Sequence, residues 1–343
     1  MNNLATLPLG LEGINSAVSR LDGIVTRTPL LSSETLDAAV GSQVLLKAES
    51  LQRGGAFKLR GAFNQIATAD PSRRVHGVVA GSSGNFGCAV AIAAAHFAVP
   101  ATVVLPHDAP SVKRAALHAL GARVIEYDRY TDDRSEVVQA TAHAQSALVL
   151  ESSDSWSLIA GHATAMAEIL EDSDGVDAVV APVGGGGLLS GCALLARLVA
   201  PRIRVIAVEL ETQQRIRPAL AAGRPVPVPV RPTLADGLAL PKIGERNYAV
   251  ISRCIDDVLV VDEDDIRTAM AVCFELLRLV VEPAGAAALA AVLRYRETFA
   301  GQRVAVILSG GNVGLERFMR AMADMSSVDL HEMRPPLTTN DTC

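Results

Sequence analysis

Residues 177–191 read DAVVAPVGGGGLLSG, a short apolar run that passes through four glycines into a helical pattern. The run predicts a buried strand over 177–183, and the pattern after the glycines predicts a helix over 188–200. Glycines let successive backbone N–H groups converge on one anion, and a helix start adds the positive end of its dipole. The stretch therefore predicts a phosphate-binding turn, with a tight structural turn as the alternative. Because it lacks both Gly-Lys-Ser/Thr and the dinucleotide glycine pattern, neither a nucleoside triphosphate nor a dinucleotide is expected.

The same order of strand and helix recurs along the chain. Further strands are expected over 43–48, 75–80, 101–105, 122–127, 203–209 and 303–308, and further helices over 86–97, 110–120 and 157–170. Such alternation predicts an α/β fold built from right-handed βαβ units, and short apolar strands predict parallel sheets covered on both faces. The proline-rich residues 224–232 predict an extended surface loop, and the polar residues 326–343 predict a flexible tail.

Length, charge and cysteine content limit the classes of protein to which the chain can belong. The 343 residues suffice for two lobes around a shared cleft, and the net charge of −6 argues against a nucleic-acid surface, which needs a basic stripe. The chain lacks a signal-peptide pattern and any run of about 18 apolar residues, so we expect no membrane span and a cytoplasmic protein. Five scattered cysteines without a CxxC pair indicate reduced thiols.

Two more turns rich in glycine and polar residues follow predicted strands. Residues 81–87 read GSSGNFG, and residues 309–312 read SGGN directly after the strand at 303–308. Either could be an ordinary loop, because serine, glycine and asparagine are common there. Ligands in open parallel sheets bind at the carboxyl ends of the strands, so three such turns predict one shared cleft.

Lysine is scarce in this chain, and one of its four lysines lies in an unusual setting. Lys58 lies within GGAFKLRG at residues 54–61, among small and apolar neighbours. Partial desolvation there would lower the pKa of the amine and make it a nucleophile. The alternative is a solvated surface lysine. The seven histidines show no metal-ligand spacing, so no metal site is expected from them.

Taken in chain order, these motifs resemble fold-type II pyridoxal-phosphate (PLP) enzymes of the threonine dehydratase and serine racemase family. The resemblance runs from about Thr28 to Arg317 and rests on five blocks, which are Gly55–Ala62, Ser82–Asn85, Gly184–Leu188, Glu282–Ala286 and Ser309–Asn312. It implies a two-domain α/β fold with PLP between the domains. The large domain would comprise residues 1–76 and 154–325, and the small domain residues 77–153. A homodimer is also implied.

The resemblance assigns a role to each motif. Lys58 would form the Schiff base with PLP and later remove the Cα proton. Phe57, Asn85, Gly184, Gly185, Gly186, Gly187, Leu188 and Ser309 would bind the cofactor, with Asn85 at the ring phenolic oxygen and Ser309 at the pyridine nitrogen. Ser82, Ser83, Asn85, Phe86 and Arg134 would bind the substrate. In the racemases of this family, a second proton donor stands where Ser83 lies here.

The chain departs from the family pattern in three places. Phe86 replaces the usual histidine, and the segment Glu151–Ser157 is more polar than usual, which implies a β-substituent larger than the methyl of threonine. That substituent would be aromatic, or cationic and paired with Glu151 or Asp154. Arg215 stands at an aspartate position of the family's divalent-cation site beside Glu209, so a guanidinium would replace the metal.

The resemblance implies an ammonia-lyase. Such an enzyme eliminates water from a small β-hydroxy amino acid, of the threonine or serine type or bulkier, and yields a keto acid and ammonia. One alternative is an amino-acid racemase of the serine type. Another, from a different class, is a catalytically silent protein that binds PLP or an amino acid.

Overall fold

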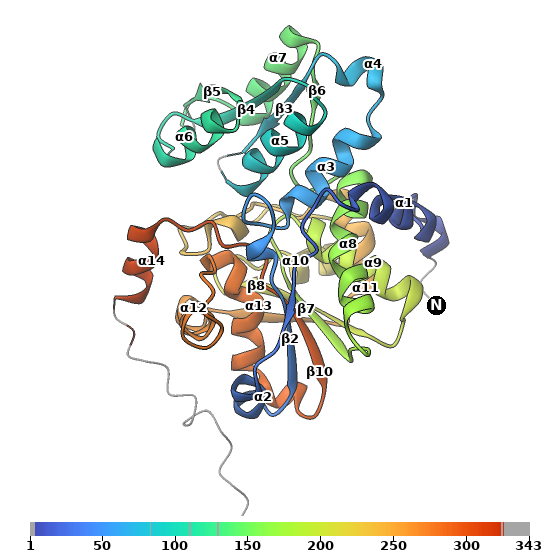
Figure 1. The fold of residues 1–343 in the computed structure, drawn as a ribbon, viewed down its shortest axis with the longest axis vertical. Helices are drawn as coiled ribbons and strands as arrows, with labels where there is room; N and C mark the ends of the chain where they lie inside the picture. Colours follow the sequence, from blue (N-terminus) through green and yellow to red (C-terminus); the bar gives the residue numbers. More distant parts are fainter. Residues whose placement is uncertain (1–3, 83, 110, 129, 324, 326–343) are drawn as a thin grey trace, which may run out of the picture.

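The computed structural model describes residues 4–82, 84–109, 111–128, 130–323 and 325, and these form two β-sheets flanked by helices (Figure 1). The larger sheet has the strand order β1-β2-β10-β7-β8-β9, and the smaller sheet has the order β5-β4-β3-β6. All neighbouring strands pair in parallel except β1 and β2. This arrangement is the α/β architecture that the alternating pattern predicts.

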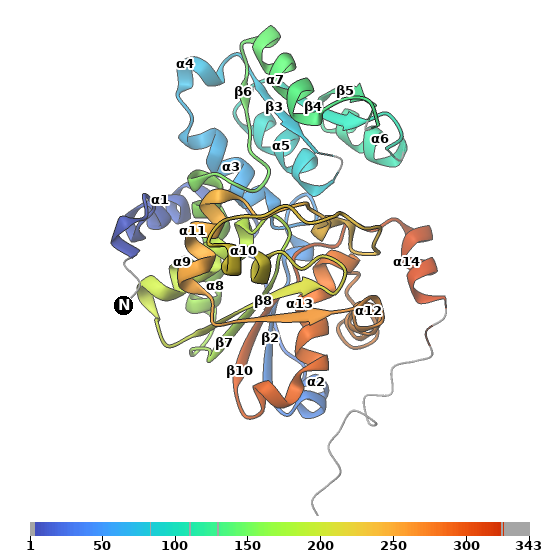
Figure 2. The same cartoon turned by 180° about the vertical axis from the view of Figure 1, so that it is seen from behind.

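The strands of the larger sheet are β1 (Leu30–Leu31), β2 (Gln43–Lys47), β7 (Ala178–Pro182), β8 (Arg204–Leu210), β9 (Asp257–Val261) and β10 (Arg303–Ile307). Those of the smaller sheet are β3 (Val78–Gly81), β4 (Ala101–Pro106), β5 (Arg123–Tyr127) and β6 (Leu148–Val149). The smaller sheet therefore lies within the segment 77–153 that the resemblance assigns to a small domain. Figure 2 shows this sheet and its helices at one end of the molecule.

Helices cover both faces of each sheet. They are α1 (Leu11–Leu21), α2 (Glu34–Val40), α3 (Lys58–Thr68), α4 (Pro71–Arg74), α5 (Asn85–His96), α6 (Ser111–Ala119), α7 (Arg134–Gln145), α8 (Trp156–Asp172), α9 (Gly187–Val199), α10 (Ile216–Ala222), α11 (Glu245–Cys254), α12 (Glu263–Leu277), α13 (Pro283–Arg294) and α14 (Leu315–Met322). Apolar residues of α8 and α9 pack on one face of the larger sheet, and those of α12 and α13 pack on the other. Short, fully buried strands such as β7 result from this double cover.

The strands and helices that the sequence pattern predicts lie within a few residues of their observed positions, whereas β1, β6, β9 and most of the other helices were not predicted. The strand expected over 75–80 begins at Val78, because α4 occupies residues 71–74 and Gly77 turns the chain with a φ of 103°. Helix α12 begins at Glu263, because Asp262 and Asp265 form a capping box at its start. No helix among the described residues is long and apolar enough to cross a bilayer.

Candidate active site

A cavity of about 720 Å³ is lined by every described residue to which the resemblance assigns catalysis or the binding of cofactor or substrate. These residues are Phe57, Lys58, Ser82, Asn85, Phe86, Arg134, Gly184, Gly185, Gly186, Gly187, Leu188 and Ser309. Ser83 lies outside the described residues. The three turns that follow β3, β7 and β10 all contribute to this cavity, as the position of ligand sites at strand carboxyl ends predicts.

The glycine turn between β7 and α9 has no room for side chains. A Cβ atom at Gly185 would lie 2.4 Å from the Ser153 hydroxyl, and one at Gly187 would lie 2.8 Å from the Ser153 carbonyl oxygen. Gly186 has a φ of 101°, which strains any other residue. The first N–H groups of α9 have no partner within the helix. The turn therefore forms a backbone cradle that fits a phosphate group at one end of the cavity.

Lys58 begins α3 and reaches the same cavity. The N–H of Phe57 donates to the Ser309 carbonyl at 3.1 Å, which joins the start of α3 to the turn after β10. Lys58 Nζ lies 4.6 Å from the centre of the Phe57 ring. Burial lowers the pKa of the Lys58 amine from 10.5 to about 8, while the charge of Glu282 acts in the opposite direction. A substantial fraction of the amine is thus neutral near pH 8 and can act as a nucleophile.

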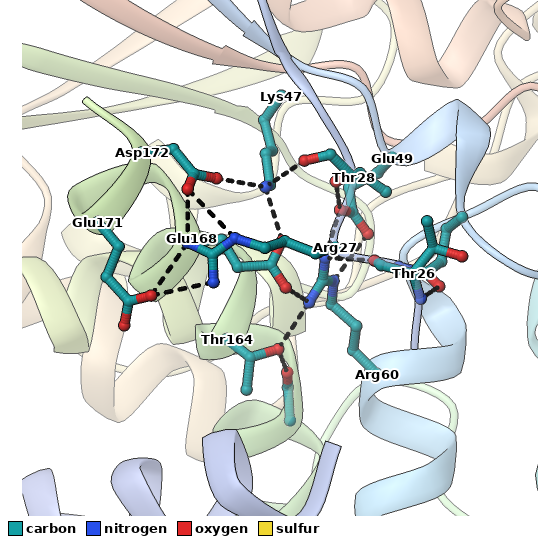
Figure 3. A network of polar contacts seen from close by, with 12 residues as sticks. Thr26, Arg27, Thr28, Lys47, Glu49, Arg60, Thr164, Glu168, Glu171 and Asp172 are labelled. Atoms are coloured by element: carbon teal, nitrogen blue, oxygen red, sulfur yellow. Dashed lines mark hydrogen bonds and ion pairs between the residues drawn. The ribbon is translucent and has the colours of Figure 1, made fainter. Parts of the chain in front are cut away.

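A buried network of charged groups fixes α3 two residues beyond Lys58 (Figure 3). The Arg60 guanidinium pairs with Glu49 at 2.7 Å and with Glu168 at 2.6 Å, and Lys47 Nζ pairs with Glu168 at 2.6 Å. The side chains of Lys47, Glu49 and Arg60 have no exposed surface. Loss of one partner would leave a buried charge unpaired. The network therefore holds the helix that carries Lys58 against β2 and α8.

Asn85 begins α5 and is oriented by two residues that the sequence analysis did not single out. Its amide nitrogen donates to Glu282 Oε1 at 2.6 Å, and its amide oxygen accepts from Asn312 Nδ2 at 2.9 Å. Asn312 Nδ2 also donates to the Gly54 carbonyl at 2.7 Å. These bonds join a helix of the smaller sheet to loops of the larger one, and they leave the second N–H of Asn85 for a ligand oxygen. Glu282 and Asn312 both lie in sequence blocks that resemble the family, and this resemblance could have identified them.

The wall of the cavity beside Ser82 is apolar on one side and cationic on the other. The Phe86 side chain is buried against the core. The Arg134 methylene Cδ lies 3.3 Å from the position of a Cβ at Gly81, so this glycine makes room for the arginine. No group among the described residues bonds to the Arg134 guanidinium. The other arginine at the cavity, Arg317, pairs with Asp236 at 2.9 Å.

The structure corrects the expected partner for a cationic substituent. The Asp154 carboxylate accepts the N–H groups of Arg246 and Asn247 at 3.0 and 3.1 Å, so it caps the start of α11. Neither Glu151 nor Trp156 lines the cavity, and that segment contributes Ser152 and Ser153 instead. The sequence alone could not distinguish a capping aspartate from one that faces a ligand.

The Arg215 side chain, which the resemblance compares with a cation ligand, is fully buried beside Glu209 at an Nε–Oε1 distance of 3.4 Å. Within the described part of the chain, no group of three or more His, Cys, Asp or Glu residues is arranged to hold a metal ion.

The motifs around Lys58 and the cradle are matched by a family model for "Pyridoxal-phosphate dependent enzyme" over residues 21–310. The chain belongs to this family. It is 39% identical to an L-threo-3-hydroxyaspartate ammonia-lyase of a Pseudomonas species over 302 residues, which cover 88% of this chain and 95% of that protein. It is 38% identical to the enzyme of the same name from Saccharomyces cerevisiae, with coverage of 88% and 93%.

The fold agrees with this membership. The structure of maize serine racemase superposes with a TM-score of 0.86 at 36% identity, covering 91% of this chain and 96% of the other. The cofactor of the family is PLP. The phosphate cradle, the desolvated amine of Lys58 and the oriented amide of Asn85 fit a phosphorylated aldehyde with a ring oxygen. The chain is thus a PLP enzyme of the hydroxyamino-acid ammonia-lyase and serine racemase group.

Proposed function

We propose that the protein is an ammonia-lyase that eliminates water from a β-hydroxy amino acid and yields a keto acid and ammonia. The observation that carries this proposal is the Lys58 amine, with a pKa lowered to about 8, in the same cavity as the glycine cradle and Asn85. PLP supplies an electron sink that acidifies the Cα proton of an attached amino acid. Lys58 would hold the cofactor through its amine, and the same amine would serve as the base that takes the Cα proton of the bound amino acid.

The remaining residues bind and orient in this proposal. The N–H groups from Gly184 to Leu188 would hold the phosphate, and Phe57 would pack beside the cofactor ring. The second N–H of Asn85 would donate to the ring oxygen. Ser309 would face the pyridine nitrogen with a neutral hydroxyl, so the ring would be a weaker electron sink than one paired with a carboxylate. Such a site would suit elimination, in which the β-hydroxyl leaves with a proton as water, better than a reaction that needs a strong electron sink.

The preferred substrate in this proposal is a 3-hydroxy dicarboxylic amino acid of the L-threo-3-hydroxyaspartate type. Two observations support this choice, namely the names of two relatives and the presence of Arg134 in the lining of the same cavity as Ser82. Ser82, Ser83 and the backbone N–H of Asn85 at the start of α5 would hold the α-carboxylate, and Arg134 would meet the second carboxylate. A cationic substituent is disfavoured there, because Asp154 is engaged in capping α11.

The test compares kcat/KM for L-threo-3-hydroxyaspartate, L-threonine and L-serine, scored by keto acid and ammonia. Arg134→Gln should lower kcat/KM for the dicarboxylate by roughly 10- to 100-fold, as expected for a lost hydrogen bond between charged groups. It should leave threonine within about threefold, which corresponds to less than 1 kcal/mol. Equal losses for both substrates would overturn the role of Arg134, and absence of keto acid from all three would overturn the lyase.

Amino-acid racemisation is the second candidate, and the likeness to maize serine racemase favours it. Exchange of the Cα proton with solvent, with formation of the D-enantiomer and without ammonia release, would identify it. A catalytically silent binding protein would show neither reaction. A homodimer remains part of the proposal, and light scattering of the purified protein tests it.

A further inference from the structure

Arg215 is one of the largest fully buried side chains in the described structure. It precedes the short helix α10 and points away from solvent into the region behind the glycine cradle. A buried guanidinium is stable only when its donors are satisfied and its charge is compensated. The groups that accept hydrogen bonds from the Arg215 guanidinium therefore identify the segments that it connects.

Backbone carbonyl groups occupy most of its donors. Nη2 donates to the Val183 carbonyl at 2.7 Å, and Nη1 donates to the carbonyls of Leu238 and Leu240 at 2.6 and 3.2 Å. Glu209 supplies the compensating charge, and its carboxylate also accepts the backbone N–H groups of Arg215 and Ile216. One planar cation thus joins three carbonyls from two separate segments.

Both segments are walls of the active-site cavity. Val183 directly precedes the first glycine of the cradle. The segment 236–240 packs on the same glycines, because a Cβ at Gly184 would lie 3.1 Å from the Gly237 carbonyl oxygen and 3.5 Å from Leu240 Cδ1. Four residues of this segment, Asp236, Gly237, Leu238 and Leu240, line the cavity.

Asn247 holds the cradle at another point. Its amide nitrogen donates to the Gly185 carbonyl at 2.8 Å and to the Ser153 carbonyl at 2.8 Å. The carbonyls of Val183 and Gly185 are therefore both held by side chains from outside the cradle, so the N–H groups between and after them point in fixed directions. A phosphate held by N–H groups depends on this preorganisation.

We propose that Arg215 is a positioning residue for the cofactor phosphate. Its guanidinium fixes the cradle through the Val183 carbonyl and holds the segment 236–240 against the cradle through the carbonyls of Leu238 and Leu240. It is an internal cation that belongs to the chain, and its contribution concerns the phosphate rather than the ring of the cofactor. The proposal rests on PLP as cofactor, which family membership establishes, and it holds whichever amino acid is the substrate.

The experiment compares the binding of PLP and of pyridoxal, which lacks the phosphate, to the cofactor-free protein. Arg215→Lys keeps the charge but cannot span three carbonyls, because an ammonium group is a compact donor without the planar fork. We expect Kd for PLP to rise at least tenfold while Kd for pyridoxal changes less than twofold. Inorganic phosphate should also compete less well with PLP for binding to the variant than for binding to the wild type. Visible absorbance and thermal shift report binding independently of turnover.

Two further variants separate positioning from general stability. Glu209→Gln removes the charge partner but leaves the carbonyl contacts of Arg215, so it should lower Tm yet keep Kd for PLP within about twofold, a small energetic change. Arg217→Lys, two residues away on an exposed face of α10, serves as the matched control. If Arg215→Lys does not fold, Arg215→Gln replaces it in the same comparison. Equal weakening of PLP and pyridoxal, or unchanged Kd for both, would overturn the proposal.

Discussion

Replacing Lys58 with methionine should stabilise the cofactor-free protein at neutral pH while abolishing its function. The physical reason is desolvation. Burial lowers the pKa of the Lys58 amine from 10.5 to about 8, so the folded protein binds this proton less tightly than the unfolded chain does. Below pH 8 the folded state must carry the charged amine at a cost that the unfolded state avoids. Methionine fills a similar volume without a charge.

The magnitude follows from the pKa difference. Each tenfold change in proton affinity corresponds to about 1.4 kcal/mol, so the cost of the charged amine is ~3 kcal/mol at pH 7. As the pH rises from 8 towards 10.5, the folded protein has lost the proton and the unfolded chain has not, so the free energy of unfolding of the wild type increases. At pH 9.5 the remaining cost is roughly 1.5 kcal/mol. The advantage of Lys58→Met should therefore shrink by about 2 kcal/mol between pH 7 and pH 9.5.

Urea unfolding of the cofactor-free wild type and variant at the two pH values measures this change, provided that the m-values agree. Lys242→Met, which removes an exposed lysine, is the matched control and should show the same small difference at both pH values. An advantage of Lys58→Met that does not vary with pH would refute the desolvated amine, whatever its absolute size.

Three further predictions concern the cofactor, the metal and the reaction. Lys58→Ala should lose the visible absorbance of the wild type and all turnover, and a variant with full turnover would remove Lys58 from its role. If the buried Arg215 guanidinium takes the place of a divalent cation, as the resemblance implies, EDTA and added Mg²⁺ or Ca²⁺ should leave activity and Tm unchanged; strong activation by either ion would contradict this. Ser83→Ala should abolish enantiomer exchange and spare most elimination, whereas equal loss of both would assign Ser83 to carboxylate binding alone.

The parts of the site that sequence reasoning could predict are those built from consecutive residues. A strand followed by glycines and a helix start is a local pattern, and the strand ends of a parallel sheet lie at one edge. This is why the sequence predicts that the turns after β3, β7 and β10 share one cavity. The lowered pKa of Lys58 was likewise predictable, because its small and apolar neighbours are adjacent in the chain.

The sequence by itself determined the α/β class, the alternation of seven strands with helices and the position of the glycine turn between β7 and α9, because hydrophobic periodicity and glycine placement act over a few residues. Only the tertiary structure decided which charged groups are buried together. Glu168 meets Arg60 from 108 residues away, Glu282 meets Asn85 from 197, and Asp154 turns out to cap α11. A charged residue in a sequence has solvent as its default partner. Burial against a specific opposite charge arises only when the packed sheets and helices exclude water and bring distant segments within hydrogen-bond distance.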